Sequence, residues 1–202
     1  MTATQPVVPL VLKALIVLLC FMFRLSGEVQ AQEKFAASLN HITSIDSTDM
    51  VVASQSDGGK GILSFPGVNK LLFLNTRTQE TRIVELPAGF VISRTFLNVP
   101  GRYEGERLVL ISGTYKGWGN NEKLEWNDPE YLFVSTASGQ HLKQISPEEE
   151  RLVEWTVNKN SNTLALITRP DTNKDKKYDA KDSNKLYIYH LTSGQLIAMP
   201  PL

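Results

Sequence analysis

The segment DTNKDKKYDAKD, residues 171–182, combines residue types and spacing that suit an ion-binding loop. Aspartate or asparagine stands at its first, third, fifth, ninth and twelfth positions. In calcium-binding loops the first, third and fifth positions supply side-chain oxygens, the seventh a backbone carbonyl, the ninth a direct or water-mediated ligand, and the twelfth a carboxylate. The predicted ligands are therefore Asp171, Asn173, Asp175, Lys177 through its carbonyl oxygen, Asp179 and Asp182.

This loop resembles the calcium loops of EF-hand and dockerin proteins, and the resemblance implies a structural Ca²⁺. It departs from their pattern at Lys176, because the sixth position usually holds the glycine of a sharp turn. Lysines also balance the charge of the aspartates, at Lys174, Lys176, Lys177 and Lys181. Long lysine side chains can keep their ammonium groups in solvent, so we expect a weak site, with a dissociation constant of roughly 10⁻⁴–10⁻³ M. The alternative is a solvated charged loop that binds no ion.

A second long loop, residues 113–130, carries aromatic side chains among asparagines and an aspartate. Its aromatic residues are Tyr115, Trp118 and Trp126. Exposed aromatic rings beside amides suit sugar rings or peptide segments, through stacking and hydrogen bonding. The sequence therefore predicts a ligand-binding loop, and the alternative is that these rings cover the core.

Several classes of function have no support in the sequence. No Gly-x-Ser-x-Gly motif is present, and residues 57–61 lack the Lys-Ser/Thr of a phosphate-binding loop. Lys plus Arg and Asp plus Glu are both 21, so the formal net charge is zero. A nucleic-acid partner would favour a basic surface, and none is predicted. The sequence assigns no catalytic residue.

The N-terminus has the pattern of a secretory signal peptide, predicted over residues 1–31. A cation at Lys13 precedes the apolar run of residues 14–23, and Ala31 supplies a small residue for cleavage. The run is shorter than the roughly 20 residues of a membrane span. We therefore expect a secreted or periplasmic protein. Arg24 leaves open an uncleaved membrane anchor as the alternative.

The remaining residues, 32–202, form short β-rich segments in a repeated order. Two strands around a turn are predicted at residues 69–87, 129–147 and 184–200. A further strand precedes each pair by about 20 residues, and another strand comes before that one. The repeat is strand, strand, long loop, strand, turn, strand, with Leu71, Tyr131 and Leu186 at equivalent positions. This predicts one all-β domain of three repeats, at about 32–87, 88–146 and 147–202. Ser146, Pro147 and Glu149 form a helix-start pattern that predicts one helical turn before the third repeat.

The repeats resemble those of bacterial TolB-type and WD-like β-propellers, in which the third strand reads much like KLYIYHLTSGQL, residues 185–196. The resemblance implies three four-stranded antiparallel blades. Three are fewer than the four that usually close a propeller, so a β-sandwich or open barrel is the alternative architecture. A homodimer with six blades in total would also close the propeller.

These patterns favour an exported, non-enzymatic, propeller-like binding protein with a structural calcium site. Its expected partner is a protein or carbohydrate that the sequence does not identify. The alternative is an extracytoplasmic hydrolase of glycan or peptide with its site in the long loops. That alternative requires acids of these loops, Glu125, Asp128 and Asp171, to converge in one cleft.

Overall fold

The computed structural model describes residues 34–55, 69–116, 128–175 and 177–200. The chain divides into two units, Met1–Leu39 and Asn40–Leu202. In the first unit the described secondary structure is a helix at residues 34–38, and the predicted signal peptide at 1–31 lies outside the described residues. No helix in the described part of the chain is long and apolar enough to cross a membrane.

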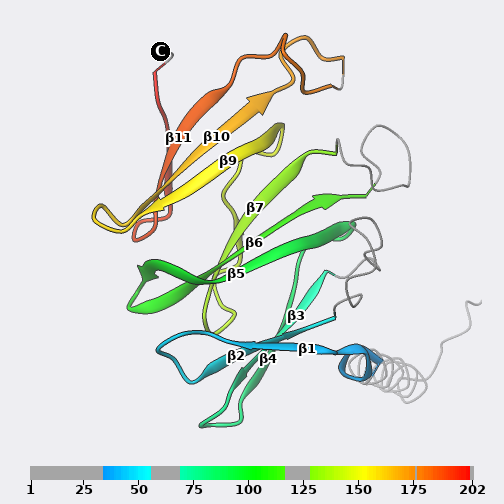
Figure 1. Cartoon of the computed structure of the whole chain (residues 1–202), viewed down its shortest axis with the longest axis vertical. Coiled ribbons are helices and arrows are strands. Elements are labelled where there is room, and N and C mark those ends of the chain that lie inside the picture. Colours follow the sequence, from blue (N-terminus) through cyan, green and yellow to red (C-terminus); the bar gives the residue numbers. More distant parts are fainter. Residues whose placement is uncertain (1–33, 56–68, 117–127, 176, 201–202) are drawn as a thin grey trace, which may run out of the picture. The chain divides into compact units, whose positions relative to one another are not determined.

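The second unit contains three four-stranded antiparallel sheets, each with its strands in chain order (Figure 1). The first sheet comprises β1 (His41–Ser44), β2 (Met50–Ser54), β3 (Lys70–Asn75) and β4 (Thr81–Glu85). The second comprises β5 (Phe90–Tyr103), β6 (Glu106–Tyr115), β7 (Glu130–Thr136) and β8 (Lys143–Gln144). The third comprises β9 (Glu150–Asn158), β10 (Thr163–Pro170), β11 (Lys185–His190) and β12 (Gln195–Ala198). The all-β prediction is confirmed, and none of these three sheets closes into a barrel.

The second sheet is buried on both faces. Leu108, Val109, Leu110 and Ile111 follow one another in β6 and are each 2% exposed or less. Successive side chains of a strand point to opposite faces. Val109 and Ile111 accordingly join the core shared with the first sheet, and Leu108 and Leu110 join the core shared with the third. A continuous apolar run is the pattern expected of a strand covered on both sides.

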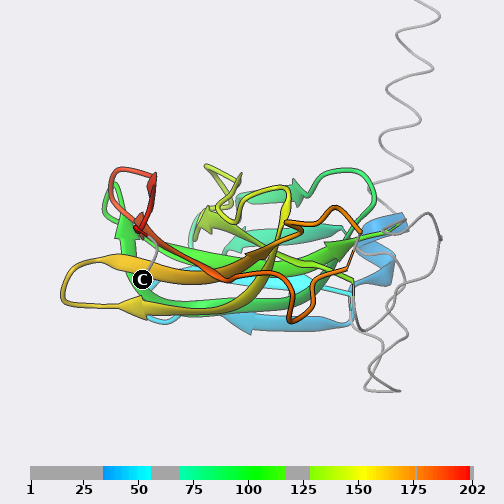
Figure 2. The same cartoon turned by 90° about the horizontal axis from the view of Figure 1, so that it is seen from above.

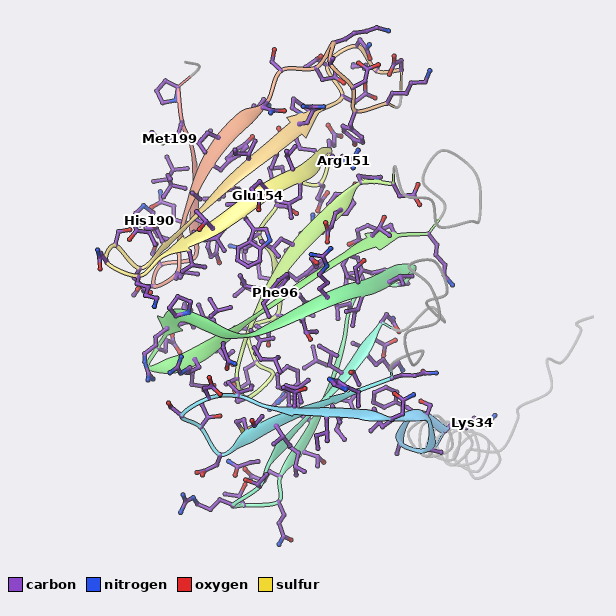
Figure 3. The ribbon with its side chains drawn as sticks, in the orientation of Figure 1. Lys34, Phe96, Arg151, Glu154, His190 and Met199 are labelled. Atoms are coloured by element: carbon purple, nitrogen blue, oxygen red, sulfur yellow. The ribbon has the colours of Figure 1, made fainter. Side chains whose placement is uncertain are left out.

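Aromatic pairs lie in each of the two cores. In the core between the first and second sheets, Phe90 of β5 and Phe133 of β7, both from the second sheet, meet edge to face at 4.9 Å between centroids. Between the second and third sheets, Phe96 of β5 meets Trp155 of β9 at 4.8 Å, also edge to face (Figure 3). Such pairs add about 0.5–1.5 kcal/mol beyond the area that they bury.

One hydrogen bond recurs at the same place in all three sheets. The residue that follows the third strand donates its N–H to a carbonyl at the start of the second strand, from the residue just before that strand in the first and third sheets and from the second residue of β6 in the second sheet. The distances are 2.8 Å from Thr76 to Asp49, 2.7 Å from Ala137 to Arg107 and 3.1 Å from Leu191 to Asn162. Hydrogen-bonded and non-hydrogen-bonded pairs alternate along an antiparallel ladder. This bond therefore identifies the equivalent face of each sheet.

The equivalent faces have the same orientation from one sheet to the next. Val109 belongs to a hydrogen-bonded pair of the second sheet and packs toward the first sheet, and Leu164 does the same in the third sheet toward the second. Val52 and Leu110 belong to non-hydrogen-bonded pairs, and each packs toward the following sheet. The second and third sheets thus each turn the equivalent face toward the sheet that precedes them.

This hydrogen bond corrects the predicted equivalence of the repeats by one residue. Counting back from the residue after the third strand, Leu71 and Leu186 correspond to Leu132, not to Tyr131. Leu71 packs toward the following sheet, as Leu132 does, whereas Tyr131 packs toward the preceding sheet. The prediction was wrong at Tyr131 because it aligned the Ser-Gly turns, and the turn of the second sheet stands one residue closer to its strand.

The helix-start pattern at residues 146–149 forms a turn instead of a helix. The N–H of Glu150 donates to the carbonyl of Pro147 at 3.4 Å, and β9 begins at once. Ser146 does not act as a helix cap, because its hydroxyl accepts the N–H of Leu132 at 2.9 Å. The partner strand provides that donor, so tertiary pairing overrides the local signal.

Candidate functional site

The three long loops are equivalent connections, each joining the second strand of a sheet to the third. They follow β2, β6 and β10, which end on the same side of the three sheets (Figure 1). Two of them are largely outside the described residues, including Trp118 and Trp126, whose predicted ligand-binding role is therefore not placed. The third loop, residues 171–184, is described except for residue 176.

Tyr115 is the aromatic residue of the second loop that the structure places. Its hydroxyl donates to Oε1 of Gln144 at 3.2 Å, and its ring contacts Phe90 at 5.1 Å and Tyr131 at 5.3 Å between centroids. Burial raises the pKa of Tyr115, and the charge of Glu148 adds to the effect. Tyr115 thus forms the rim of the first core, and a role in ligand binding stays a prediction.

The first half of the 171–182 loop gathers oxygens around one backbone amide. The N–H of Asp175 donates to Oδ1 of Asp171 at 3.1 Å and to Oδ1 of Asn173 at 3.0 Å. Oδ1 of Asp175 in turn accepts the N–H of Lys177 at 2.9 Å. The side-chain oxygens predicted as the first and third ligands therefore lie close together. Lys174 makes the turn with a φ of 60°, in the left-handed region.

The second half of the loop is closed by Asp182, which is 6% exposed. Its Oδ1 accepts the N–H of Thr172 at 2.9 Å and the hydroxyl of Thr172 at 2.6 Å, and its Oδ2 accepts the N–H of Asp179 at 3.2 Å. The hydroxyl and the amide of Thr172 lower the pKa of Asp182. The carboxylate consequently stabilises the fold fully above its ordinary pKa near 3.8, and that stabilisation is lost as pH falls through the lowered pKa.

These contacts divide the predicted calcium ligands into two sets. Asp171, Asn173 and Asp175 converge, whereas both oxygens of Asp182 close the loop and Oδ1 of Asp179 accepts the N–H of Lys181 at 2.8 Å. Among the described residues, no group of three or more His, Cys, Asp or Glu is arranged to hold a metal ion. Calcium binding at this loop stays a prediction.

Tyr178 is a half-buried residue of the same loop, and sequence analysis did not single it out. Burial strongly raises the pKa of Tyr178, and the nearby Tyr131 and the charges of Asp171 and Glu149 raise it further. A half-buried tyrosine favours a fixed loop over a freely solvated one.

Glu150 is the second residue that sequence analysis missed. It is 6% exposed, and its Oε1 accepts from Nζ of Lys185 at 2.7 Å and from the hydroxyl of Tyr187 at 3.0 Å. Its Oε2 accepts from the hydroxyl of Thr168. The bond to Glu150 is the main reason that the pKa of Lys185 is raised. Glu150 therefore ties β9 to β10 and β11.

The acids of the hydrolase alternative come from different loops. Asp128 is 7% exposed at the end of the second loop, Asp171 is half-buried at the start of the third, and Glu125 lies outside the described residues. No protein-family model matches the chain, and a search of curated proteins found no match.

We predict that Glu150→Ala lowers the free energy of unfolding by about 2–4 kcal/mol, because three donors lose a buried carboxylate acceptor. The melting temperature should fall by roughly 5–15 °C in a thermal scan followed by circular dichroism. Glu149→Ala is the matched control, since that neighbouring side chain is exposed, and it should change stability by less than about 0.5 kcal/mol. Equal effects of the two substitutions would contradict an anchoring role for Glu150.

We predict that calcium raises the melting temperature of the protein through the 171–182 loop. At a tenfold excess over the dissociation constant the gain is about 1.4 kcal/mol, or roughly 2–4 °C. The shift should vanish in Asp175→Ala and persist in Asp46→Ala, an acid-to-alanine control in the turn between β1 and β2. Thermal scans with millimolar CaCl₂ and with chelator measure it. No shift in the wild type, or an equal shift in Asp175→Ala, would mean that the loop binds no ion.

Proposed function

We propose that this chain is an exported, non-enzymatic binding protein built from propeller-like repeats of the TolB or WD type. The observation that carries the proposal is the repeated orientation of the sheets, since the second and third each pack the equivalent face toward the preceding sheet. A constant relation between successive four-stranded antiparallel sheets is the arrangement of propeller blades. Export is proposed from the signal-peptide pattern of residues 1–31.

The proposed binding surface is formed by the three long loops. Loops on one side of a rigid β scaffold commonly carry recognition, and here the same connection of each sheet contributes. Asp182 and Tyr178 hold the third loop in place, and the proposed calcium ion would add to that order. The aromatic and amide side chains of residues 113–130 suit a glycan or an extended peptide.

The hydrolase alternative has less support. It needs carboxylates that converge on a substrate, yet the buried Asp128 and the half-buried Asp171 belong to loops of different sheets. Glu150, a buried acid at the start of β9, already accepts hydrogen bonds from three donors. No described residue therefore favours a hydrolytic site over a binding surface.

The outer faces of the first and third sheets both carry groups of aliphatic side chains, and we propose that a second copy of the chain covers them. On the first sheet the aliphatic residues of this face are Ile42, Val51, Ala53, Leu72, Leu74 and Ile83, and Lys70 and Glu85 share the face. On the third sheet they are Ala165, Ile167, Leu186, Ile188, Ile197 and Met199 (Figure 3 labels Met199), and Glu154 and Thr156 of β9 share the face. Several are well exposed, among them Ile42 at 62%, Ile197 at 39% and Met199 at 43%.

The two outer faces match as consecutive sheets do within the chain. The outer face of the first sheet carries the residues of hydrogen-bonded pairs, and in the second and third sheets that face packs on the preceding sheet. The outer face of the third sheet carries the residues of non-hydrogen-bonded pairs, which in the first and second sheets face the following sheet. The third sheet of one copy can thus receive the first sheet of another. Two such contacts related by a two-fold axis would close a ring of six sheets.

We predict that the exported protein begins near Gln32 and binds a glycan or peptide through its long loops. Protein purified from the exported fraction would be sequenced at its N-terminus and applied to glycan and peptide arrays. Trp118→Ala with Trp126→Ala should abolish retention, whereas Asn160→Ala, in the turn between β9 and β10 on the other side of the sheets, should not. Met1 retained in the membrane fraction would indicate an anchor, and turnover of a bound array ligand would indicate the hydrolase.

We predict that residues 32–202 form a dimer at micromolar concentration, measured by size-exclusion chromatography with light scattering. Ile197→Lys should shift it to monomer with unchanged circular dichroism, because an unpaired buried charge costs several kcal/mol, or at least a hundredfold in affinity. Thr78→Lys, an equal change of charge in the turn between β3 and β4, should remain a dimer. A compact wild-type monomer, or a dimer that Ile197→Lys does not disturb, would contradict closure by a second copy.

A further inference from the structure

A pocket of about 330 Å³ lies between the second and third sheets, away from the long loops. Its lining residues lie in or next to three short turns: the turn between β5 and β6, the turn before β8, and the turn between β11 and β12. Figures 1 and 2 both show the turns that follow β5 and β11 at the end opposite to that where β6 and β10 finish. The pocket is therefore distinct from the proposed loop surface.

The floor of the pocket is apolar, and two phenol groups stand above it. Leu108, Val134 and Leu191 form the floor and are 2%, 6% and 1% exposed. Tyr103 and Tyr189 line the walls, and neither hydroxyl makes a hydrogen bond within the described part of the chain. Burial raises the pKa of Tyr189, and the nearby Tyr103 raises it further. Tyr189 is thus a protonated donor at neutral pH.

Lys143 supplies the positive charge of the pocket. Its Nζ donates to the carbonyl of Gly194 at 3.0 Å and lies 5.8 Å from the centre of the Tyr189 ring. Gly194 has a φ of 67°, a conformation that a glycine adopts without strain, and this turn presents its carbonyl to the lysine. The bond uses one of three ammonium protons. Among the described residues, no ion pair joins a carboxylate to Lys143.

One acid stands at the rim, and it limits the charge of a ligand. Glu104 lies 4.0 Å from Nε2 of His141, with its side chain 69% exposed. The ring of His141 lies 5.1 Å from that of Tyr103. A single carboxylate at the rim disfavours multiply charged anions such as phosphate, while the Lys143 cation favours one negative charge.

We propose that this pocket binds a small organic monocarboxylate with a compact apolar body. The carboxylate meets the two free N–H groups of Lys143 and the phenol hydroxyls of Tyr103 and Tyr189, which are all donors. The apolar body covers the leucine and valine floor. A volume near 330 Å³ is at the lower end of ligand pockets, so the ligand is small. The site does not depend on the long loops or on the proposed function.

Sodium benzoate is the probe that tests this site, titrated into ¹⁵N-labelled protein and followed by two-dimensional NMR. Saturable shifts are expected at the amides of residues 134–136 and 189–194, with a dissociation constant on the order of 1 mM. Benzamide, which has the same shape without the charge, should bind at least tenfold more weakly. Lys143→Met should weaken benzoate binding roughly tenfold or more, because a charge-assisted hydrogen bond is lost.

Lys70→Met is the matched control, since this lysine lies on the first sheet in an ion pair with Glu85, and it should leave benzoate affinity unchanged. Tyr103→Phe, which keeps the ring and removes only a donor, should weaken binding a few-fold and tests the pocket if Lys143→Met does not fold. Absence of saturable shifts in the wild type would overturn the proposal. Equal binding of benzamide, or equal loss in Lys70→Met, would also overturn it.

Discussion

The structure of residues 40–202 depends on the burial of the second sheet on both of its faces. Four consecutive residues of β6, Leu108 to Ile111, are almost inaccessible to solvent, and alternation along the strand divides them between two cores. Burying each such side chain contributes about 1.5–3 kcal/mol. The second sheet therefore requires a neighbour on either side, and the first and third sheets meet that requirement with one core each.

The same alternation leaves the outer sheets with an aliphatic face that the described residues do not bury fully. Ile83 is 36% exposed on the first sheet, and Ile167 and Ile197 are 36% and 39% exposed on the third. Single exposed aliphatic residues are normal on protein surfaces, whereas a contiguous apolar patch indicates an interaction site. Cross-strand pairs place these residues in rows across four strands of the first sheet and three strands of the third, so the requirement for apolar burial that organises the second sheet extends to the outer sheets.

The order of strands and the long loops could be predicted from alternating apolar residues and turn residues, but register and partners could not. The Ser-Gly turn made Tyr131 appear equivalent to Leu71, although burial makes Leu132 the equivalent residue. The anchoring role of Glu150 could not be predicted, because its donors on β10 and β11 lie 18 or more residues away in the sequence. The spacing of the calcium-loop ligands could be seen in the sequence. The hydrogen bonds by which Asp182 closes the loop on Thr172 depend on three-dimensional geometry that this spacing does not contain.

Two ends of the sheets are thus available for different chemistry. At one end lie the long connections between second and third strands, and Asp182 orders the connection of the third sheet from within. At the other, tight turns such as that at Gly194 keep the backbone close to the sheets, so a recess between two sheets is walled by strand ends instead of loops. A loop surface adapts to an extended partner, whereas a recess with a fixed cation selects a small one by shape and charge. The antiparallel order of four strands keeps the two kinds of surface apart, because second-to-third connections and the other two turns of each sheet necessarily lie at opposite ends of the strands.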